Sequence, residues 1–358
     1  MSHLFTRKII TPSRGRKRLK SGHAVPNNQD GRRPSEAKSI AYRDANYEEW
    51  LQVHAGFYMI EHALRISEKS ENLCNKLLET KHMPPTRTIF SDETFEEACQ
   101  RLQGKNEARI VQDIARLLVP SADALATFSD TRFEVLVESV DEGWSNSIQV
   151  TNPRPQPDYA VGFRETAFTP EQLKKLKPAL GHPLYQSHFM ATYYMCFPFL
   201  TSEAKCGTAG LGLADRQNAH SMTLAVRGIV ELFKLAKREN ELNREILTFS
   251  VSHDDRAVML YGYYPIINES QFTIHRHLIR SFDIQDLDGK EKWTAYGFTI
   301  EVYNESLNLL DKLRSVIDEL PPDFTLEQTQ PAPSDEDSQP SASDELPERA
   351  SKKRKVAE

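Results

Sequence analysis

The stretch Phe199-Leu-Thr-Ser-Glu-Ala-Lys-Cys206 decides how the rest of the chain is interpreted. It begins like a short buried strand and ends with two charges. Side chains of a strand alternate between its two faces, so Glu203 and Lys205 project to the same side. A carboxylate and an ammonium beside each other on an apolar strand cost free energy unless they are paired or used. The stretch therefore predicts either a buried ion pair or a functional site.

A second short strand is predicted upstream, at Asp158-Tyr-Ala-Val-Gly-Phe163, and Pro157 introduces it. Together the two stretches give Pro-Asp followed by Glu-x-Lys. This pattern resembles the active-site signature of the PD-(D/E)xK nuclease superfamily. The resemblance covers roughly residues 100–300 and implies an α/β (α+β) fold, with a restriction-endonuclease-like core built on a central mixed sheet flanked by helices.

The resemblance also implies a metal site and a catalytic lysine. Phosphodiester hydrolysis needs a divalent cation, an activated water and stabilisation of the charge that develops at phosphorus. Mg²⁺ takes oxygen ligands, and Mn²⁺ is the alternative ion. Asp158 and Glu203 would supply two ligands, and the backbone carbonyl of Ala204 a third. Lys205 would hold the water or the scissile phosphate as a point charge.

Two further residues complete the expected site. Glu107 precedes Ile110, Val111 and Ile114 by three, four and seven residues, so it lies on the apolar stripe of the helix predicted from 106 to 118. A carboxylate there either complements the helix dipole in the first turn or is functional. In the superfamily, an acid on an early helix often completes the metal site, which makes Glu107 the candidate. Gln217 occupies the place of a glutamine that recurs after the third core strand in parts of the superfamily.

The charge of the chain is unevenly distributed. Of its 358 residues 27% are charged; residues 1–43 contain eleven Lys or Arg and two acids, whereas residues 335–348 contain six acids and no base. We therefore expect any contact with nucleic acid to be local rather than spread over the whole surface. The four cysteines show no metal-like pairing and suggest a reducing compartment. No apolar run approaches the roughly 18 residues of a membrane span.

Composition divides the chain into four parts. We expect a disordered basic tail over 1–40, a helical lead-in over 41–90, the nuclease-like domain over 91–320, and a disordered acidic tail over 321–358. The last part closes with four bases and a valine that resemble a monopartite nuclear import signal: Lys352, Lys353, Arg354, Lys355 and Val356. The expected location is the nucleus, with a nuclear import receptor as a partner.

Periodicity and turn residues predict the remaining elements. A helix is expected over 44–80, with a buried stripe of Trp50, Val53, Phe57, Ile60 and Leu64. Glycines between 207 and 212 predict a loop that lets the backbone pass close to the site. The pattern also predicts a strand or a short helix over 133–140, a helix over 215–240, strands over 246–252, 257–264 and 271–279, a strand or strand-to-helix segment over 293–300, and a helix over 301–320.

Three hypotheses remain open from the sequence. The first is a nuclear Mg²⁺-dependent nuclease that acts on DNA or another nucleic acid. The second is a non-catalytic module on the same fold, which binds nucleic acid or protein. The third is an unrelated α/β protein in which Glu203 and Lys205 are a structural ion pair. If Asp158, Glu203 and Lys205 lie close together in space, the third hypothesis is disfavoured. Binding of a metal ion would then distinguish the nuclease from the non-catalytic module.

Overall fold

A computed structural model describes residues 40–180, 186–206, 210–269 and 271–321 of the chain. The predicted tails, apart from Ile40 and Pro321, lie outside these ranges, and so do residues 207–209 of the predicted glycine loop. Within the described residues, no helix has both the length and the apolar character to cross a membrane.

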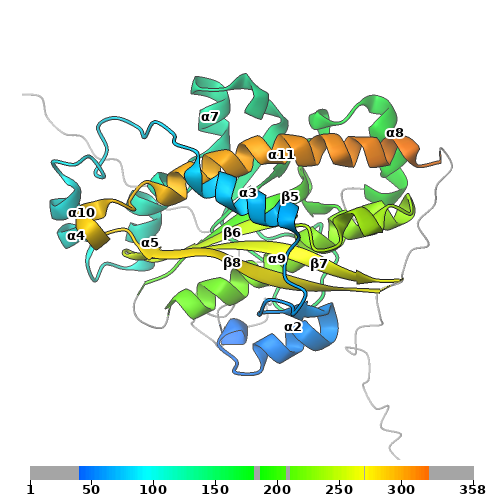
Figure 1. The fold of residues 1–358 in the computed structure, drawn as a ribbon, viewed down its shortest axis with the longest axis horizontal. Helices are drawn as coiled ribbons and strands as arrows, with labels where there is room; N and C mark the ends of the chain where they lie inside the picture. Colours follow the sequence, from blue (N-terminus) through cyan, green and yellow to red (C-terminus); the bar gives the residue numbers. More distant parts are fainter. Residues whose placement is uncertain (1–39, 181–185, 207–209, 270, 322–358) are drawn as a thin grey trace, which may run out of the picture.

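The protein has an α+β fold built on a mixed eight-stranded sheet (Figure 1). The strand order is β1-β8-β7-β6-β5-β3-β2, and β4 pairs with β5 beside this path. The pairs β5–β6 and β1–β8 are parallel, and the other pairs are antiparallel. The strands are β1 (Phe57–Tyr58), β2 (Leu136–Val140), β3 (Tyr159–Phe163), β4 (Met190–Thr192), β5 (Met195–Ala204), β6 (Thr248–His253), β7 (Ala257–Asn268) and β8 (Gln271–Asp283). The predicted central mixed sheet is confirmed.

Strand β5 lies inside the sheet, between β3 and β6, and all ten of its residues are buried. Its apolar run is typical of a strand that is covered on both faces. In the antiparallel pair β3–β5, Tyr159 lies opposite Ser202, so Asp158 precedes β3 at the level where β5 carries Glu203. The two predicted strands are therefore neighbours.

Helices cover both faces of the sheet (Figure 1). Helix α9 (Gly210–Leu235) packs on one face, where Asn218 hydrogen-bonds Thr201 of β5. Helix α11 (Thr294–Glu319) packs on the other, where the rings of Phe298 and Phe249 are 5.9 Å apart. Thr201 pairs with Ser250, the residue after Phe249, so the two contacts point to opposite sides of the sheet. Helix α2 (Tyr47–Ala55) contacts α9, and α3 (Glu68–Glu79) contacts α11.

Shorter helices surround these two layers. The helix that the sequence predicts from 106 to 118 is present, but its middle, Val111–Ala115, is a π-helix between α5 (Glu107–Ile110) and α6 (Arg116–Leu118). The other α-helices are α4 (Phe95–Leu102), α7 (Ala122–Phe128), α8 (Pro170–Leu180) and α10 (Asp286–Gly289), and 3₁₀ turns occur at Thr131–Val135, Glu165–Ala167 and Glu239–Leu242.

The prediction of one helix over 44–80 is wrong. Gly56 adopts a left-handed conformation with φ of 62°, which ends α2, and β1 follows at once. A new helix, α3, begins only after Ser67, whose side chain accepts a hydrogen bond from the Ser70 N–H. Of the predicted buried stripe only Phe57 is buried; the other four residues are all more than half exposed: Trp50, Val53, Ile60 and Leu64.

Two other boundaries differ from the sequence prediction. Helix α9 begins at Gly210 and ends at Leu235, so two of the predicted loop glycines, Gly210 and Gly212, belong to its first turn. Residues 294–300 are helical and continuous with the predicted helix over 301–320, so the strand alternative for 293–300 is wrong. The predicted ambiguity over 133–140 has a simple cause, because a 3₁₀ turn over Thr131–Val135 leads directly into β2.

Candidate active site at the end of strand β5

Three carboxylates meet at one ammonium group at the end of β5. The Nζ atom of Lys205 lies 3.1 Å from Glu203 Oε2, 3.2 Å from Glu107 Oε1 and 3.5 Å from Asp158 Oδ2. Glu203 is 1% exposed and Lys205 is 6% exposed. Four of the residues that the sequence singles out, from three separate parts of the chain, are therefore brought together.

Local structure explains the position of each acid. Asp158 stands just before β3, where its Oδ2 accepts a hydrogen bond of 2.8 Å from the backbone N–H of Ala204. Glu107 is the first residue of α5, because the side chain of Asn106 accepts a hydrogen bond from the Arg109 N–H and starts the helix. The Glu107 side chain is 43% exposed, so the cluster opens to solvent on the side of this helix.

Lys205 is held from two directions. Its backbone N–H donates to the carbonyl of His253, at the end of the parallel neighbour β6, at 2.9 Å. On the other side, Gly210 begins α9 so close to Lys205 that a Cβ added to this glycine would lie 2.7 Å from the Lys205 Cβ. A glycine is thus needed for the helix to start there, as the predicted close approach of backbone to the site requires.

The charges of the cluster are not balanced. Burial raises the pKa of Glu203 well above its ordinary value, the neighbouring Asp158 raises it further, and Lys205 offsets only part of this. Burial alone would lower the pKa of Lys205, but Glu203, Asp158 and Glu107 together outweigh it and raise that pKa above its ordinary value. Lys205 is therefore charged at neutral pH, and three carboxylates share its single positive charge.

The oxygen atoms around Lys205 suit a hard divalent cation. The two carboxylates of Asp158 and Glu203 and the carbonyl of Ala204 all lie near Lys205 Nζ, the carbonyl at 2.9 Å. Two formal negative charges remain after Lys205 is counted, which a divalent ion would neutralise. Among the described residues, however, no three Asp, Glu, His or Cys side chains are gathered as a ready metal site, and the ammonium stands between the acids. A cation would have to displace it.

Gln217 is near this arrangement without joining it. It lies on α9, seven residues after Gly210 and so on the same helix face. Its Oε1 atom is buried and has no hydrogen-bond partner among the described residues. The amide oxygen is thus able to accept a hydrogen bond, and among the described residues no hydrogen bond joins this oxygen to Lys205.

Two neighbours of the cluster are not marked by any motif. Tyr42 is buried, and its pKa is raised well above the ordinary value by burial first and then by the charges of Tyr47 and Glu203. Its hydroxyl lies 3.1 Å from Nδ1 of His220 on α9. His253 is fully buried beside Ala204, and burial lowers its pKa. Only His253 carries a sequence signal, because it ends the strand that runs parallel to β5.

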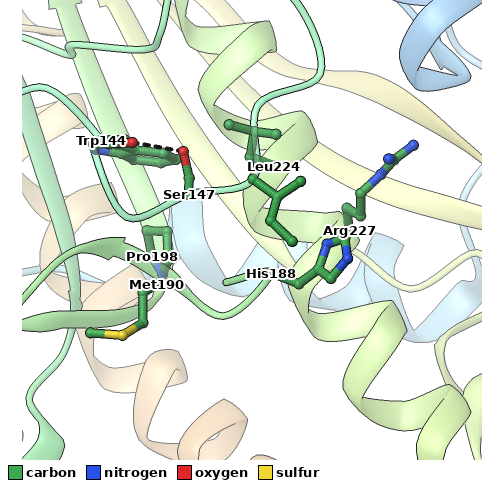
Figure 2. A pocket seen from close by; sticks show the side chains of 8 residues that line it. Trp144, Ser147, His188, Met190, Pro198, Leu224 and Arg227 are labelled. Atoms are coloured by element: carbon green, nitrogen blue, oxygen red, sulfur yellow. Dashed lines mark hydrogen bonds between the residues drawn. The ribbon is translucent and has the colours of Figure 1, made fainter. Parts of the chain in front are cut away.

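Two hollows, of about 570 and 610 Å³, lie away from Lys205 and are lined mainly by residues around α4 and α10 and around α3 and α11 respectively. Figure 2 shows a much smaller one, of about 10 Å³, between Trp144, Pro198, Leu224 and the stem of Arg227. It has room for one water at most.

The chain belongs to the family defined by a domain of unknown function (DUF7924), whose model matches residues 94–317, more than half of the chain. No curated protein matches it.

Proposed function

We propose that this member of the DUF7924 family is a nuclear, metal-dependent nuclease-like protein that hydrolyses nucleic-acid phosphodiester bonds. The proposal includes a restriction-endonuclease-like core within the mixed sheet, as in the PD-(D/E)xK superfamily. Its support is one observation: Asp158 beside β3, Glu203 on β5 and Glu107 at the start of α5 surround Lys205, with two formal negative charges in excess.

The residues of the cluster would divide the chemistry among them. Asp158, Glu203 and the carbonyl of Ala204 would hold Mg²⁺ or Mn²⁺, with Glu107 as an additional acid. When bound, the ion supplies a Lewis acid that polarises the phosphoryl oxygen and favours ionisation of a water. Lys205 keeps its proton at neutral pH, so it would donate hydrogen bonds to the attacking water or to the phosphate oxygens rather than act as a base.

Gln217 would act beside this group as an acceptor. Its buried Oε1 has no hydrogen-bond partner among the described residues, so it would accept a hydrogen bond from the attacking water or from a water bound to the substrate. Asp158 is held by the Ala204 N–H, so its carboxylate is already oriented before any ion arrives. Such prior positioning lowers the cost of assembling the reacting groups.

A specific observation favours the second candidate, a non-catalytic module that binds nucleic acid or protein. Lys205 Nζ is within 3.5 Å of all three acids, so the lysine itself occupies the centre of the cluster. If a metal ion cannot displace the ammonium, the same residues form a buried ion cluster that holds β3, β5 and α5 together.

A cleavage assay with metal titration separates the two candidates. Full-length protein is incubated with single-stranded, duplex and branched DNA and with RNA, in Mg²⁺, in Mn²⁺ and in a chelator. The nuclease proposal expects metal-dependent cleavage that disappears in chelator and in E203Q, together with calorimetric binding of the ion. Absence of both cleavage and ion binding in the wild-type protein would decide for the non-catalytic module.

We also propose that the segment Lys352–Val356 directs the protein to the nucleus through an import receptor. The support is its sequence, four consecutive bases followed by a valine. Deleting this segment should reduce nuclear accumulation of a fluorescent fusion, whereas deleting the acidic residues 335–348 should leave it unchanged. Equal nuclear accumulation of the fusion with and without Lys352–Val356 would reject the assignment.

A further inference from the structure

Arg116 is a positively charged residue near the acid cluster, and it lines the same small hollow as Asp158. It is half-buried at the start of α6, and within the described part of the chain it makes no ion pair. Its guanidinium lies over the ring of Tyr159, with Cζ 4.1 Å from the ring centroid. Stacking on an aromatic ring uses one face of the guanidinium and leaves its N–H edge available for a planar or tetrahedral anion.

The ring beneath Arg116 is a rigid support. The hydroxyl of Tyr159 donates to Glu138 at 2.8 Å, accepts from the Ala122 N–H at 3.1 Å, and lies 3.2 Å from the hydroxyl of Tyr303. Glu138, the nearest acid in this group, also accepts from the hydroxyl of Ser121 at 2.8 Å. Because these bonds hold Tyr159 in place, the guanidinium stacked on it loses little further freedom when it binds an anion.

A small hollow connects Arg116 with Asp158. It measures about 30 Å³ and is lined by both residues together with Ser202, Ala204 and His253. Ser202 and Ala204 alternate with Glu203 along β5, so the hollow lies on the other face of the strand, with Asp158 common to both sides. Nε2 of the fully buried His253 has no protein partner there among the described residues, which suits a hollow that contains water. A space of this size has room for water but not for a phosphate group, so an anion would lie at its rim.

The π-helical turn brings Arg116 nearer to the side of Glu107 than a regular α-helix would. Nine residues separate them, about two and a half turns of a regular α-helix, which would put them on opposite faces. The wider turn over Val111–Ala115 completes less rotation in the same number of residues, so Arg116 comes back towards the side of Glu107. Single π-turns of this kind are frequent at functional sites.

We propose that Arg116 binds a backbone phosphate of the nucleic acid next to the phosphate that is held at Lys205. This inference rests on the proposed nuclease-like function, because it takes nucleic acid to be the ligand. The guanidinium would donate two parallel hydrogen bonds to one phosphate from its position over Tyr159. The contact carries no base information, so it contributes equally to all sequences and sets the position of the strand over the acids.

The experiment measures binding without cleavage. Labelled single-stranded and duplex oligonucleotides are titrated with full-length protein in a chelator, by fluorescence anisotropy at several salt concentrations. R116A should weaken binding about tenfold on every sequence, as expected for a charge-assisted hydrogen bond. It should also reduce the slope of log K against log salt by roughly one phosphate contact. R116K keeps the positive charge but loses the two parallel N–H donors of arginine, so its affinity should lie between those of the wild-type protein and R116A.

Arg109 provides the matched control on the same helix. Its Nε is 2.6 Å from Asp113, so R109A removes an equal charge whose guanidinium is already engaged, and binding should stay close to wild type. Melting curves show whether R116A is folded. If it is not, the binding comparison is made with R116K instead. Wild-type affinity in R116A and R116K would overturn the role of Arg116 and leave the proposed function standing. A wild-type protein that binds no oligonucleotide, either in the chelator or with Mg²⁺ or Mn²⁺, would overturn both.

Discussion

Helix α9 begins between two buried charge clusters that are built differently. Asp215 accepts a hydrogen bond of 2.9 Å from the hydroxyl of Tyr261, and its Oδ2 is 3.4 Å from Nη1 of Arg276. The Arg276 guanidinium stacks 4.3 Å above the Tyr261 ring, so this cluster has one acid, one base and one phenol. Five residues earlier, Gly210 touches Lys205, where three acids share one base.

The difference indicates what each cluster is for. The pair of Asp215 and Arg276 joins α9 to β7 and β8 with one acid facing one base, although Asp215 Oδ1 and Arg276 Nη1 are buried without a hydrogen-bond partner among the described residues. In the other cluster three acids face one base, and burial first, then the charge of Asp158, raises the pKa of Glu203. Strongly perturbed groups of this kind concentrate at functional sites because a ligand or a reaction uses the imbalance. The experiments below compare the two clusters directly.

The largest expected effect is removal of the base from each cluster. K205M and R276M keep much of the side-chain volume, and each leaves a buried acid unpaired, at a cost of about 3–5 kcal/mol in the free energy of unfolding. Mg²⁺ should restore stability to K205M, whose three acids then form an open cation site, and should leave R276M unchanged. K205M should also lose cleavage by about 10²–10³-fold. Thermal melting with and without Mg²⁺ makes the comparison, and equal behaviour of the two variants would make Lys205 structural.

The second comparison neutralises one acid in each cluster. E203Q removes a carboxylate whose pKa is raised by burial and by Asp158, so the metal-free protein should melt a few degrees higher at neutral pH. D215N removes the carboxylate that faces Arg276 and should lower the melting temperature. E203Q should also abolish calorimetric Mg²⁺ binding, while D215N should retain it. A destabilised E203Q would show that the acids are already compensated without metal.

The free energy of unfolding should depend on pH in opposite ways for Glu203 and for the buried histidines. Burial lowers the pKa of His220 to about 3 and that of His275 to about 4, whereas unfolded histidine titrates near 6.5. Between its folded and unfolded pKa values each histidine is protonated in the unfolded chain but remains neutral in the folded protein. The stabilising effect is complete above about pH 6.5 and is lost as pH falls, by about 1.4 kcal/mol per pH unit for each histidine.

Glu203 acts in the opposite direction over part of that range. Its folded pKa is raised, so protonation favours the folded state as pH falls through that pKa, and E203Q lacks this gain. Urea unfolding between neutral pH and about pH 4.5 should therefore show a steeper loss for E203Q than for the wild type, and a shallower loss for H220Q. Parallel curves for wild type and E203Q would mean that Glu203 titrates normally in the folded protein.

The members of the acid cluster can be predicted from the sequence, but the way they are arranged around Lys205 cannot. Strand alternation places Glu203 and Lys205 on one face, and the position of Glu107 on an apolar stripe marks it as unusual; the structure brings both to one ammonium. The role of Lys205 at the centre of the acids could not be read in this way. It depends on distances between three segments, which no local pattern encodes.

The errors came from local signals that tertiary contacts overrule. A spacing close to 3.6 residues suggested one long helix over 44–80, but Gly56 and Ser67 were the end and start signals that divide it, and β1 pairs with β8 between them. Likewise, the glycines between 207 and 212 predict a loop, because glycine disfavours helices. Contact with Lys205 makes glycine necessary in the first turn of α9.

The smallest expected effect comes from replacing Gly210, which contacts Lys205, and Gly212 provides the control two residues away. A Cβ at Gly212 would meet nothing within 4 Å, so G212A should stabilise the helix by roughly 0.5–1 kcal/mol. A Cβ at Gly210 would meet the Lys205 Cβ, which is not a flexible chain end, so the start of α9 or the end of β5 must move. G210A should cost about 1–3 kcal/mol and weaken Mg²⁺ binding. Melting and calorimetry of both variants measure this; if G210A gains stability as G212A does, α9 does not constrain Lys205, and the cluster is positioned by β5, β3 and α5 alone.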